Sequence, residues 1–235
     1  MEYITINKIL IEIEYKKIKN IHLSVYPPDG RIHISAPETM KPDSVRLYAV
    51  SKLSWISKQK EKVLQQERQT PREYVSGENH YFKGQRYRLK VIYHKDVPRV
   101  ELGGKKYINL YVREDSTVAK RAEVLKEWYR KELRETLLPL IEKWSQILQV
   151  STKHWEIKQM KTRWGSCNTR TRRLLFNLEL AKKPPHCIEY IVVHELTHLI
   201  ERQHNERYIS ILSTHLPQWE VYKDELNEFI AVSYT

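Results

Sequence analysis

The stretch IEYIVVHELTHLIERQH, residues 188–204, holds two histidines, His194 and His198, four positions apart. Its apolar residues recur at helical spacing, and Pro184 and Pro185 just before it favour the start of a helix. On a helix, two such residues share one face and lie about 6 Å apart along the axis. Both imidazoles can then reach one zinc ion at about 2.0–2.1 Å. The stretch therefore predicts a helix that carries a metal site.

Glu195 follows the first histidine directly. On a helix it lies about 100° around the axis from that histidine, near enough to reach a water on the metal without replacing it. The metal lowers the pKa of the water, and the carboxylate can take the proton and return it to a leaving group. The pattern predicts a zinc-dependent hydrolase with Glu195 as general base.

His204 is the candidate third ligand, six positions after His198. On a continuous helix it would point about 120° away from His198. We therefore expect the helix to end or bend near residues 202–203 if His204 binds the metal. Three residues of the C-terminal segment are alternative third ligands, namely His215, Glu220 and Glu225.

The rest of the chain predicts an α+β protein. Strand-like alternation occurs at residues 3–6, 9–15, 22–26, 31–35, 81–82, 87–93, 99–102 and 107–112, with one long helix at 44–66. A second long helix is predicted at 117–148, bent or broken at Pro139. Two strands, 154–161 and 173–180, are predicted around the loop RWGSCNTRTR, and no internal repeat is evident. We expect a strand-rich domain at 1–114 and a largely helical domain at 115–235, whose strand pair packs on the metal helix.

Composition limits the class of protein. The 235 residues include no apolar run near the roughly 20 residues that span a bilayer, and the alternating N-terminus does not resemble a signal peptide. Two cysteines, Cys167 and Cys187, do not make a disulfide framework. These features predict a soluble, cytoplasmic protein without membrane partners. The net charge of +12 suits a polyanionic partner such as a nucleotide or a nucleic acid.

Several stretches together resemble a known family. MKTRWGSC (160–167), LLFNLELA (174–181), the Pro184-Pro185 pair and IEYIVVHELTHL with His204 resemble the YgjP-like metallopeptidases and, more distantly, the SprT-like zinc proteases. The likeness is close over about residues 150–220. It implies that residues 115–235 form a zincin-like domain with one Zn²⁺ and that His204 is the third ligand, and it leaves open whether the substrate is a peptide or protein or a nucleotide.

The loop RWGSCNTRTR matches the signature that this family carries beside its site. Arg163 and Ser166 are its candidate substrate-binding residues, and the strand before the loop can pair with an extended substrate. We expect Trp164 to pack under the metal helix and Cys167 not to bind the metal. Asn177 and Glu179 are expected to face solvent. The many basic residues at 161–183 favour acidic peptides or phosphate-bearing substrates.

Four functions fit the sequence. A zinc-dependent peptidase is the leading interpretation. A metal-dependent nucleoside-triphosphate pyrophosphatase or phosphohydrolase could use the same zinc site, although no G-x-x-x-x-G-K loop is present. A DNA-associated protease would bind nucleic acid through the N-terminal half, with a steep salt dependence. A purely structural zinc is the fourth interpretation, and Glu195 argues against it.

Overall fold

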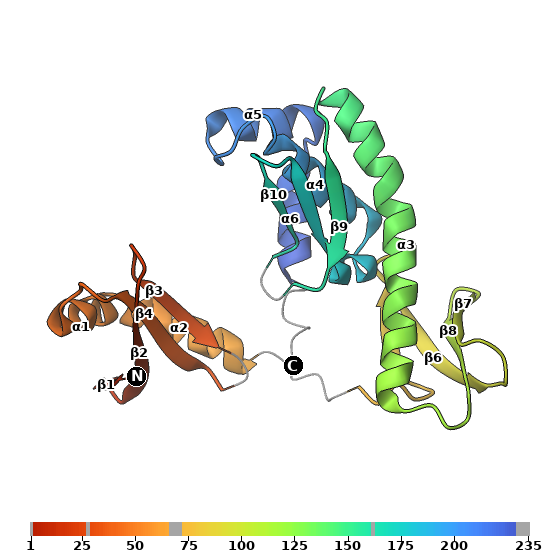
Figure 1. Ribbon diagram of the computed structural model, residues 1–235, viewed down its shortest axis with the longest axis horizontal. Helices are drawn as coiled ribbons and strands as arrows, with labels where there is room; N and C mark the ends of the chain where they lie inside the picture. Colours follow the sequence, from red (N-terminus) through yellow and green to blue (C-terminus); the bar gives the residue numbers. More distant parts are fainter. Residues whose placement is uncertain (1, 27–28, 66–71, 161–162, 229–235) are drawn as a thin grey trace. The chain divides into compact units, whose positions relative to one another are not determined.

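The computed structural model describes residues 2–26, 29–65, 72–160 and 163–228, and its architecture is α+β, with a strand-rich N-terminal half (Figure 1). The described residues group into two compact units, residues 2–65 and residues 72–228. In the described ranges, no helix has both the length and the apolar character needed to cross a membrane.

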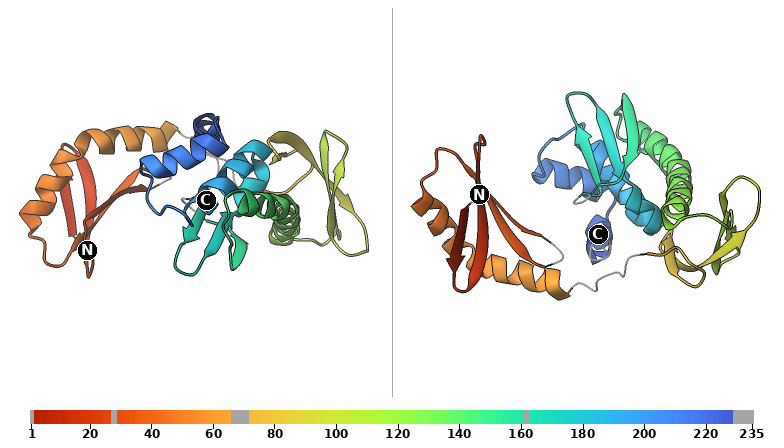
Figure 2. Two further views of the ribbon diagram at one scale, coloured as in Figure 1. Left: turned by 90° about the horizontal axis from the view of Figure 1, so that it is seen from above. Right: turned by 60° about the horizontal axis from the view of Figure 1, so that its bottom comes forward.

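The first unit is a four-stranded sheet with two helices. The strands are β1 (Glu2–Ile6), β2 (Ile9–Lys16), β3 (His22–Tyr26) and β4 (Arg31–Pro37), in the order β1-β2-β4-β3. Strands β2 and β4 are parallel, and both outer pairs are antiparallel. Figure 2 shows α1 (Pro42–Ser51) and α2 (Leu53–Gln65) along this sheet. Alternate residues of the strands, such as Ile11 and Ile34, are fully buried and share a core with Val45 and Ile56 of the helices.

The prediction of a single helix at 44–66 is wrong in one respect, because the structure has two helices that are separated at Lys52. The backbone of Lys52 leaves the helical region at φ −104° and ψ 6°, and its N–H bonds back to the carbonyls of Ala49 and Val50. The first helix also begins earlier than Ser44, with Pro42 in its first turn, where a missing N–H costs no hydrogen bond.

The second unit begins with another four-stranded sheet. Its strands are β5 (Asn79–Phe82), β6 (Gln85–Tyr93), β7 (Arg99–Gly103) and β8 (Tyr107–Val112), in the order β5-β6-β8-β7. The central pair is parallel and the outer pairs are antiparallel, so the connectivity is the same as in the first sheet. Even the first hairpins match, with two positive-φ residues in each turn, Asn7-Lys8 and Lys83-Gly84. The structure therefore contains a repeated topology that the residue identities do not reveal.

Helix α3 (Val118–Ile147) joins this sheet to the rest of the second unit (Figure 1). It begins at Thr117, whose side chain accepts a hydrogen bond from the Lys120 N–H, and it continues for 30 residues through Pro139. The expected break at Pro139 is absent. Phe82 of β5 lies 4.7 Å, between ring centroids, from Trp128 of α3. Because the second sheet and α3 share one hydrophobic core, residues 79–112 group with the later residues, and the structural division falls before residue 72 and not at 114/115.

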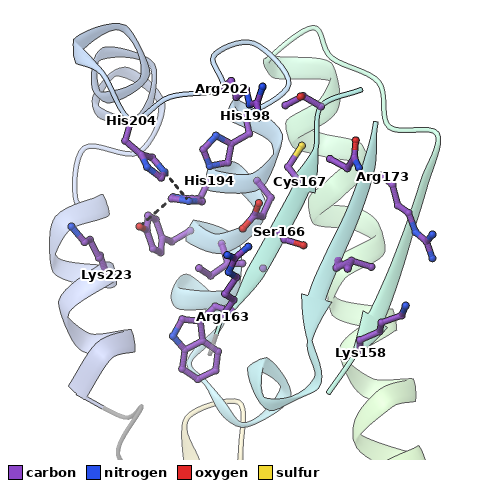
Figure 3. A pocket seen from close by; sticks show the side chains of 18 of the residues that line it. Lys158, Arg163, Ser166, Cys167, Arg173, His194, His198, Arg202, His204 and Lys223 are labelled. Carbon is purple, nitrogen blue, oxygen red and sulfur yellow. Dashed lines mark hydrogen bonds between the residues drawn. The ribbon is translucent and has the colours of Figure 1, made fainter. Parts of the chain in front are cut away.

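A third sheet precedes the metal helix. It contains β9 (His154–Lys158), β10 (Gly165–Asn168) and β11 (Arg173–Asn177), in the order β10-β11-β9. The prediction of two strands here missed a third, β10, which lies inside the predicted loop. β10 pairs antiparallel with β11, whereas β9 and β11 are parallel. Residues Leu178–Lys182 form the 3-10 helix η1 and not more strand. Helices α4 (Pro185–Thr197), α5 (Glu206–His215) and α6 (Trp219–Glu228) follow, and Figure 3 shows α4 beside this sheet.

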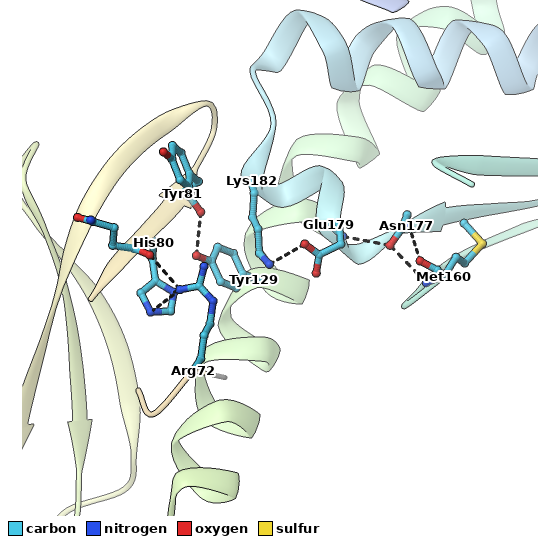
Figure 4. Close-up of polar contacts among 9 residues, drawn as sticks. Arg72, His80, Tyr81, Tyr129, Met160, Asn177, Glu179 and Lys182 are labelled. Carbon is cyan, nitrogen blue, oxygen red and sulfur yellow. Dashed lines mark hydrogen bonds and ion pairs between the residues drawn. The ribbon is translucent and has the colours of Figure 1, made fainter. Parts of the chain in front are cut away.

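A buried polar cluster lies where β5 meets α3 and η1 (Figure 4). The side chain of His80 is 2% exposed, and its Nε2 lies 3.2 Å from Nη1 of Arg72 and 3.3 Å from Oε2 of Glu78. Nearby, the Tyr129 hydroxyl donates to the Tyr81 carbonyl at 2.8 Å. Burial, followed by the positive charge of Arg72, lowers the pKa of His80 to about 4, while Glu78 opposes the shift.

This cluster predicts a loss of stability in acid. The folded pKa of His80 lies below its unfolded value of about 6.5, so only the unfolded chain binds the proton as the pH falls from about 6.5 to about 4. The free energy of unfolding of the second unit should fall by about 1–3 kcal/mol over that window. Urea unfolding at pH 7.5 and pH 4.5 measures it. His80→Gln should reduce the pH dependence by about this amount, and the exposed control His154→Gln should leave it unchanged; equal slopes in the two variants would contradict the assignment.

Candidate metal centre

Helix α4 presents His194 and Glu195, and His198 is its C-cap. The helix ends at Thr197, where the N–H groups of Ile200 and Glu201 both bond to the Thr197 carbonyl. The chain then turns, and Asn205 starts α5 by accepting a hydrogen bond from the Tyr208 N–H. The helix therefore ends before the expected region near 202–203. This early end is what returns His204 to the other two histidines.

Figure 3 shows His194, His198 and His204 pointing toward one another. Nε2 of His194 lies 3.3 Å from Nε2 of His204, and one candidate ligand atom from each of the three rings lies within 4.8 Å of the others. Two ligands bound to tetrahedral zinc at about 2.05 Å are about 3.3 Å apart. Three imidazoles with room for a fourth position are typical of catalytic zinc sites. The donor set thus fits one zinc ion.

The hydrogen bonds of two rings leave Nε2 for a metal. Nδ1 of His198 lies 3.3 Å from the Glu201 carbonyl, which can only accept, so Nδ1 carries the proton. Nδ1 of His194 lies 3.4 Å from the Tyr190 hydroxyl. Burial, then the neighbouring His198 and His204, lower the pKa of His194 to about 3. A neutral ring with a protonated Nδ1, as the Glu201 carbonyl selects at His198, is the form that binds zinc through Nε2.

Glu195 is 4% exposed and faces the strand β10. A Cβ added at Gly165 would lie 2.5 Å from Glu195 Oε1, which means that the backbone of the strand passes directly over the carboxylate. Burial raises the pKa of Glu195 to about 8, and the charge of Arg163 opposes this shift. A buried carboxyl with a raised pKa beside candidate metal ligands is suited to accept and donate a proton near neutral pH.

The histidines and Glu195 line a cavity of about 1060 Å³. Arg163, Ser166 and Cys167 line the same cavity, so the signature loop and the metal helix meet there. Trp164 also lines it and is half-buried, with the Lys183 ammonium 5.1 Å above its ring. Cys167 is not among the residues whose ligand atoms converge with the histidines, and burial raises the pKa of its thiol to about 11.

The alternative third ligands lie elsewhere. Glu225 Oε2 is 2.6 Å from Nε2 of His186, and the His215 ring packs edge-on against Trp144. Neither these two nor Glu220 belongs to the described residues that line the cavity.

Asn177 was expected to face solvent, and the structure corrects this. It is 1% exposed, and its Nδ2 donates to the Met160 carbonyl at 2.9 Å (Figure 4). The same Nδ2 also donates to the Arg163 carbonyl at 2.8 Å. Its Oδ1 accepts from the N–H groups of Met160 and Glu179. Glu179 is also buried, at 7% exposure, and accepts from the Lys182 ammonium. The hydrogen bonds of Asn177 therefore hold the backbone that leads to Arg163 and Gly165 in position. The alternation of strand residues does not indicate this role.

Comparisons with known proteins place the chain in a family. A search of the curated proteins found no match. Among solved structures, the chain is similar to the crystal structure of the metallopeptidase zymogen of Methanocaldococcus jannaschii jannalysin, at 19% identity and a TM-score of 0.35, over 38% of this chain and 92% of that one. The family model described as "YgjP-like, metallopeptidase domain" matches residues 19–229. The chain therefore belongs to the YgjP-like family of metallopeptidases.

Proposed function

We propose that this protein is a zinc-dependent peptidase in which His194, His198 and His204 bind one zinc ion and Glu195 is the general base. The observation that carries the proposal is the convergence of three imidazoles on the cavity that also contains the buried Glu195 carboxylate. Membership of a metallopeptidase family supports a metal and a peptide or protein substrate. The metal helix with the three-stranded sheet beside it would then be a zincin-like core.

Each residue of the proposed site would have its own role in peptide hydrolysis. Bound zinc would polarise the scissile carbonyl and lower the pKa of the attacking water. Glu195 would take the proton of that water and deliver it to the leaving amine, the work of a buried carboxylate placed beside the metal ligands. The Glu201 carbonyl would orient the imidazole ring of His198, and the Tyr190 hydroxyl would orient that of His194. Arg163 and Ser166, which line the cavity, would contact the peptide.

The edge of β10 offers a place for an extended peptide. The strand is at one end of its sheet, and the Asn177 N–H bonds to the Trp164 carbonyl. In an antiparallel ladder, hydrogen-bonded pairs alternate with pairs whose N–H and C=O point outward. Gly165 and Cys167 therefore direct their backbone polar groups to the open edge, where a substrate strand could pair.

Metal content tests the proposal directly. We expect one zinc per chain in the wild type by elemental analysis and almost none in His194→Ala, because two imidazoles alone hold zinc weakly. His215→Ala is the matched control, a histidine of the same unit outside the cavity, and it should keep its zinc. Chelation should abolish cleavage of an unstructured protein, and added zinc should restore it. A wild type that takes up no zinc after supplementation would overturn the proposal.

A further inference from the structure

The charges that line the cavity are strongly unequal. Among the described residues, a single lining side chain is acidic, Glu195, and six are basic: Lys158, Arg163, Arg170, Arg173, Arg202 and Lys223. Glu195 is buried against β10, so it does not balance the exposed cations. The wall that a substrate meets is therefore positive.

Two of the six cations already have a carboxylate partner. Lys158 lies 3.5 Å from Glu156, and Arg173 pairs with the same carboxylate. Within the described ranges, none of the other four is paired with an acidic side chain; these are Arg163, Arg170, Arg202 and Lys223. All four are exposed to solvent at the cavity.

The four unpaired cations come from four different segments. Arg163 precedes β10, and Arg170 lies in the turn between β10 and β11. Arg202 follows α4, and Lys223 projects from α6 on the other side of the histidines (Figure 3). Like charges gathered around one concave site repel each other and concentrate the field in it, so an anionic ligand is drawn in and relieves the repulsion.

The positions of these four cations suit an extended acidic peptide better than a triphosphate group. A triphosphate group needs donors gathered on one point, supplied in most nucleotide sites by a glycine-rich loop. Here the only glycine among the described lining residues is Gly165, and its outer face is filled by Glu195. An extended peptide along β10 would instead pass several of the cations in turn, with side chains on alternating sides.

On these grounds we infer that the cavity selects acidic peptide segments, with aspartate or glutamate on both sides of the cleaved bond. The inference rests on the proposed peptidase function, and it names the substrate class of that same site. An exposed ion pair alone contributes little, so the selectivity comes from several cations acting together.

Binding to zinc-loaded, full-length Glu195→Gln separates charge selectivity from catalysis. The probes are three fluorescently labelled decapeptides of the same sequence, with glutamate, glutamine or lysine at four flanking positions. We expect the glutamate peptide to bind about tenfold tighter than the glutamine peptide at low salt, and the lysine peptide to bind weakest. The difference should shrink as salt screens exposed charges. Equal affinities, or stronger competition by a nucleoside triphosphate than by the glutamate peptide, would overturn the inference.

Charge-reversal variants test two of the four cations themselves. Arg170→Glu and Lys223→Glu, in the same background, should each reduce the preference for the glutamate peptide about threefold. Lys105→Glu is the matched control, because Lys105 is an exposed lysine in the turn between β7 and β8, outside the cavity lining. A similar loss in Lys105→Glu would show that only net charge matters and would overturn the inference.

Catalysis is measured separately with the wild type. Cleavage of the glutamine peptide tests the peptidase proposal without any contribution from substrate charge. Selective binding of acidic peptides without cleavage of any peptide would refute the peptidase function while the charge selectivity stands. Cleavage without selectivity would refute the charge inference alone.

Discussion

Glu195→Gln is expected to lower kcat for peptide cleavage by about 10³-fold and to leave the zinc content unchanged. Glutamine keeps the shape of the side chain beside Gly165 but cannot take a proton from water, and a positioned general base contributes about 10²–10⁴-fold. Since Glu195 is buried and is not one of the converging ligand residues, its replacement should not release the metal. Steady-state kinetics together with elemental analysis of the same sample measure both quantities.

The control for this variant is Glu189→Gln on the same helix. Glu189 accepts hydrogen bonds from Lys143 and from the Trp144 indole N–H, both at 2.8 Å, and does not line the cavity. Its replacement should leave kcat within about twofold, because substitutions outside the site rarely change it more. A Glu195→Gln protein that holds zinc and retains wild-type kcat would show that another group moves the proton.

Gly165→Ala is expected to lower kcat/KM about 100-fold or more, although it adds a single methyl group. The new Cβ would lie 2.5 Å from Oε1, 2.8 Å from Cγ and 2.9 Å from Cδ of Glu195. Gly165 does not have a positive φ, so its backbone accepts alanine, and the three atoms nearest to the new Cβ all belong to the Glu195 side chain. A displacement of about 1 Å in a catalytic group costs about 10²-fold. We also expect about 1–3 kcal/mol of lost stability from overpacking.

A double-mutant cycle isolates this contact. In a Glu195→Ala background the clashing atoms are gone, so Gly165→Ala should cost little further stability. Ser166→Ala, at the neighbouring position, should cost little in either background. The readout is the midpoint of urea unfolding for the four proteins of the cycle. An equal cost of Gly165→Ala in both backgrounds would mean that the glycine serves the strand and not the carboxylate.

The most local features were predictable from the sequence. The His194–His198 spacing places both rings on one helical face wherever that helix lies, and Glu195 then follows by a fixed rotation. The strands of the first two sheets were also found, because one-sided burial imposes an alternation of apolar residues that can be read without knowing the partner strand. Family membership, predicted from the motifs around this helix, is confirmed.

Features that depend on distant residues were missed. β10 lies in a segment that was predicted to be a loop, because its four residues lack a long alternating pattern and pair with β11 residues five to eleven positions away. Asn177 looks like a solvent-facing strand residue, yet it is buried because its amide satisfies the backbone groups of residues 160 and 163. The division of the chain was placed after β8, whereas Phe82 and Trp128 share one core.

The sequence by itself determined the chemistry of the candidate site, since residue type and helical spacing suffice to pair two histidines with one glutamate. Only the tertiary structure decided what surrounds them. Helix α4 ends at Thr197, which allows His204 to approach the other two histidines. The backbone of Gly165 lies against the Glu195 side chain, and cations from four segments line the cavity. Helical and strand periodicity are set by neighbours within a few residues, whereas these contacts depend on packing between segments that are far apart in the chain.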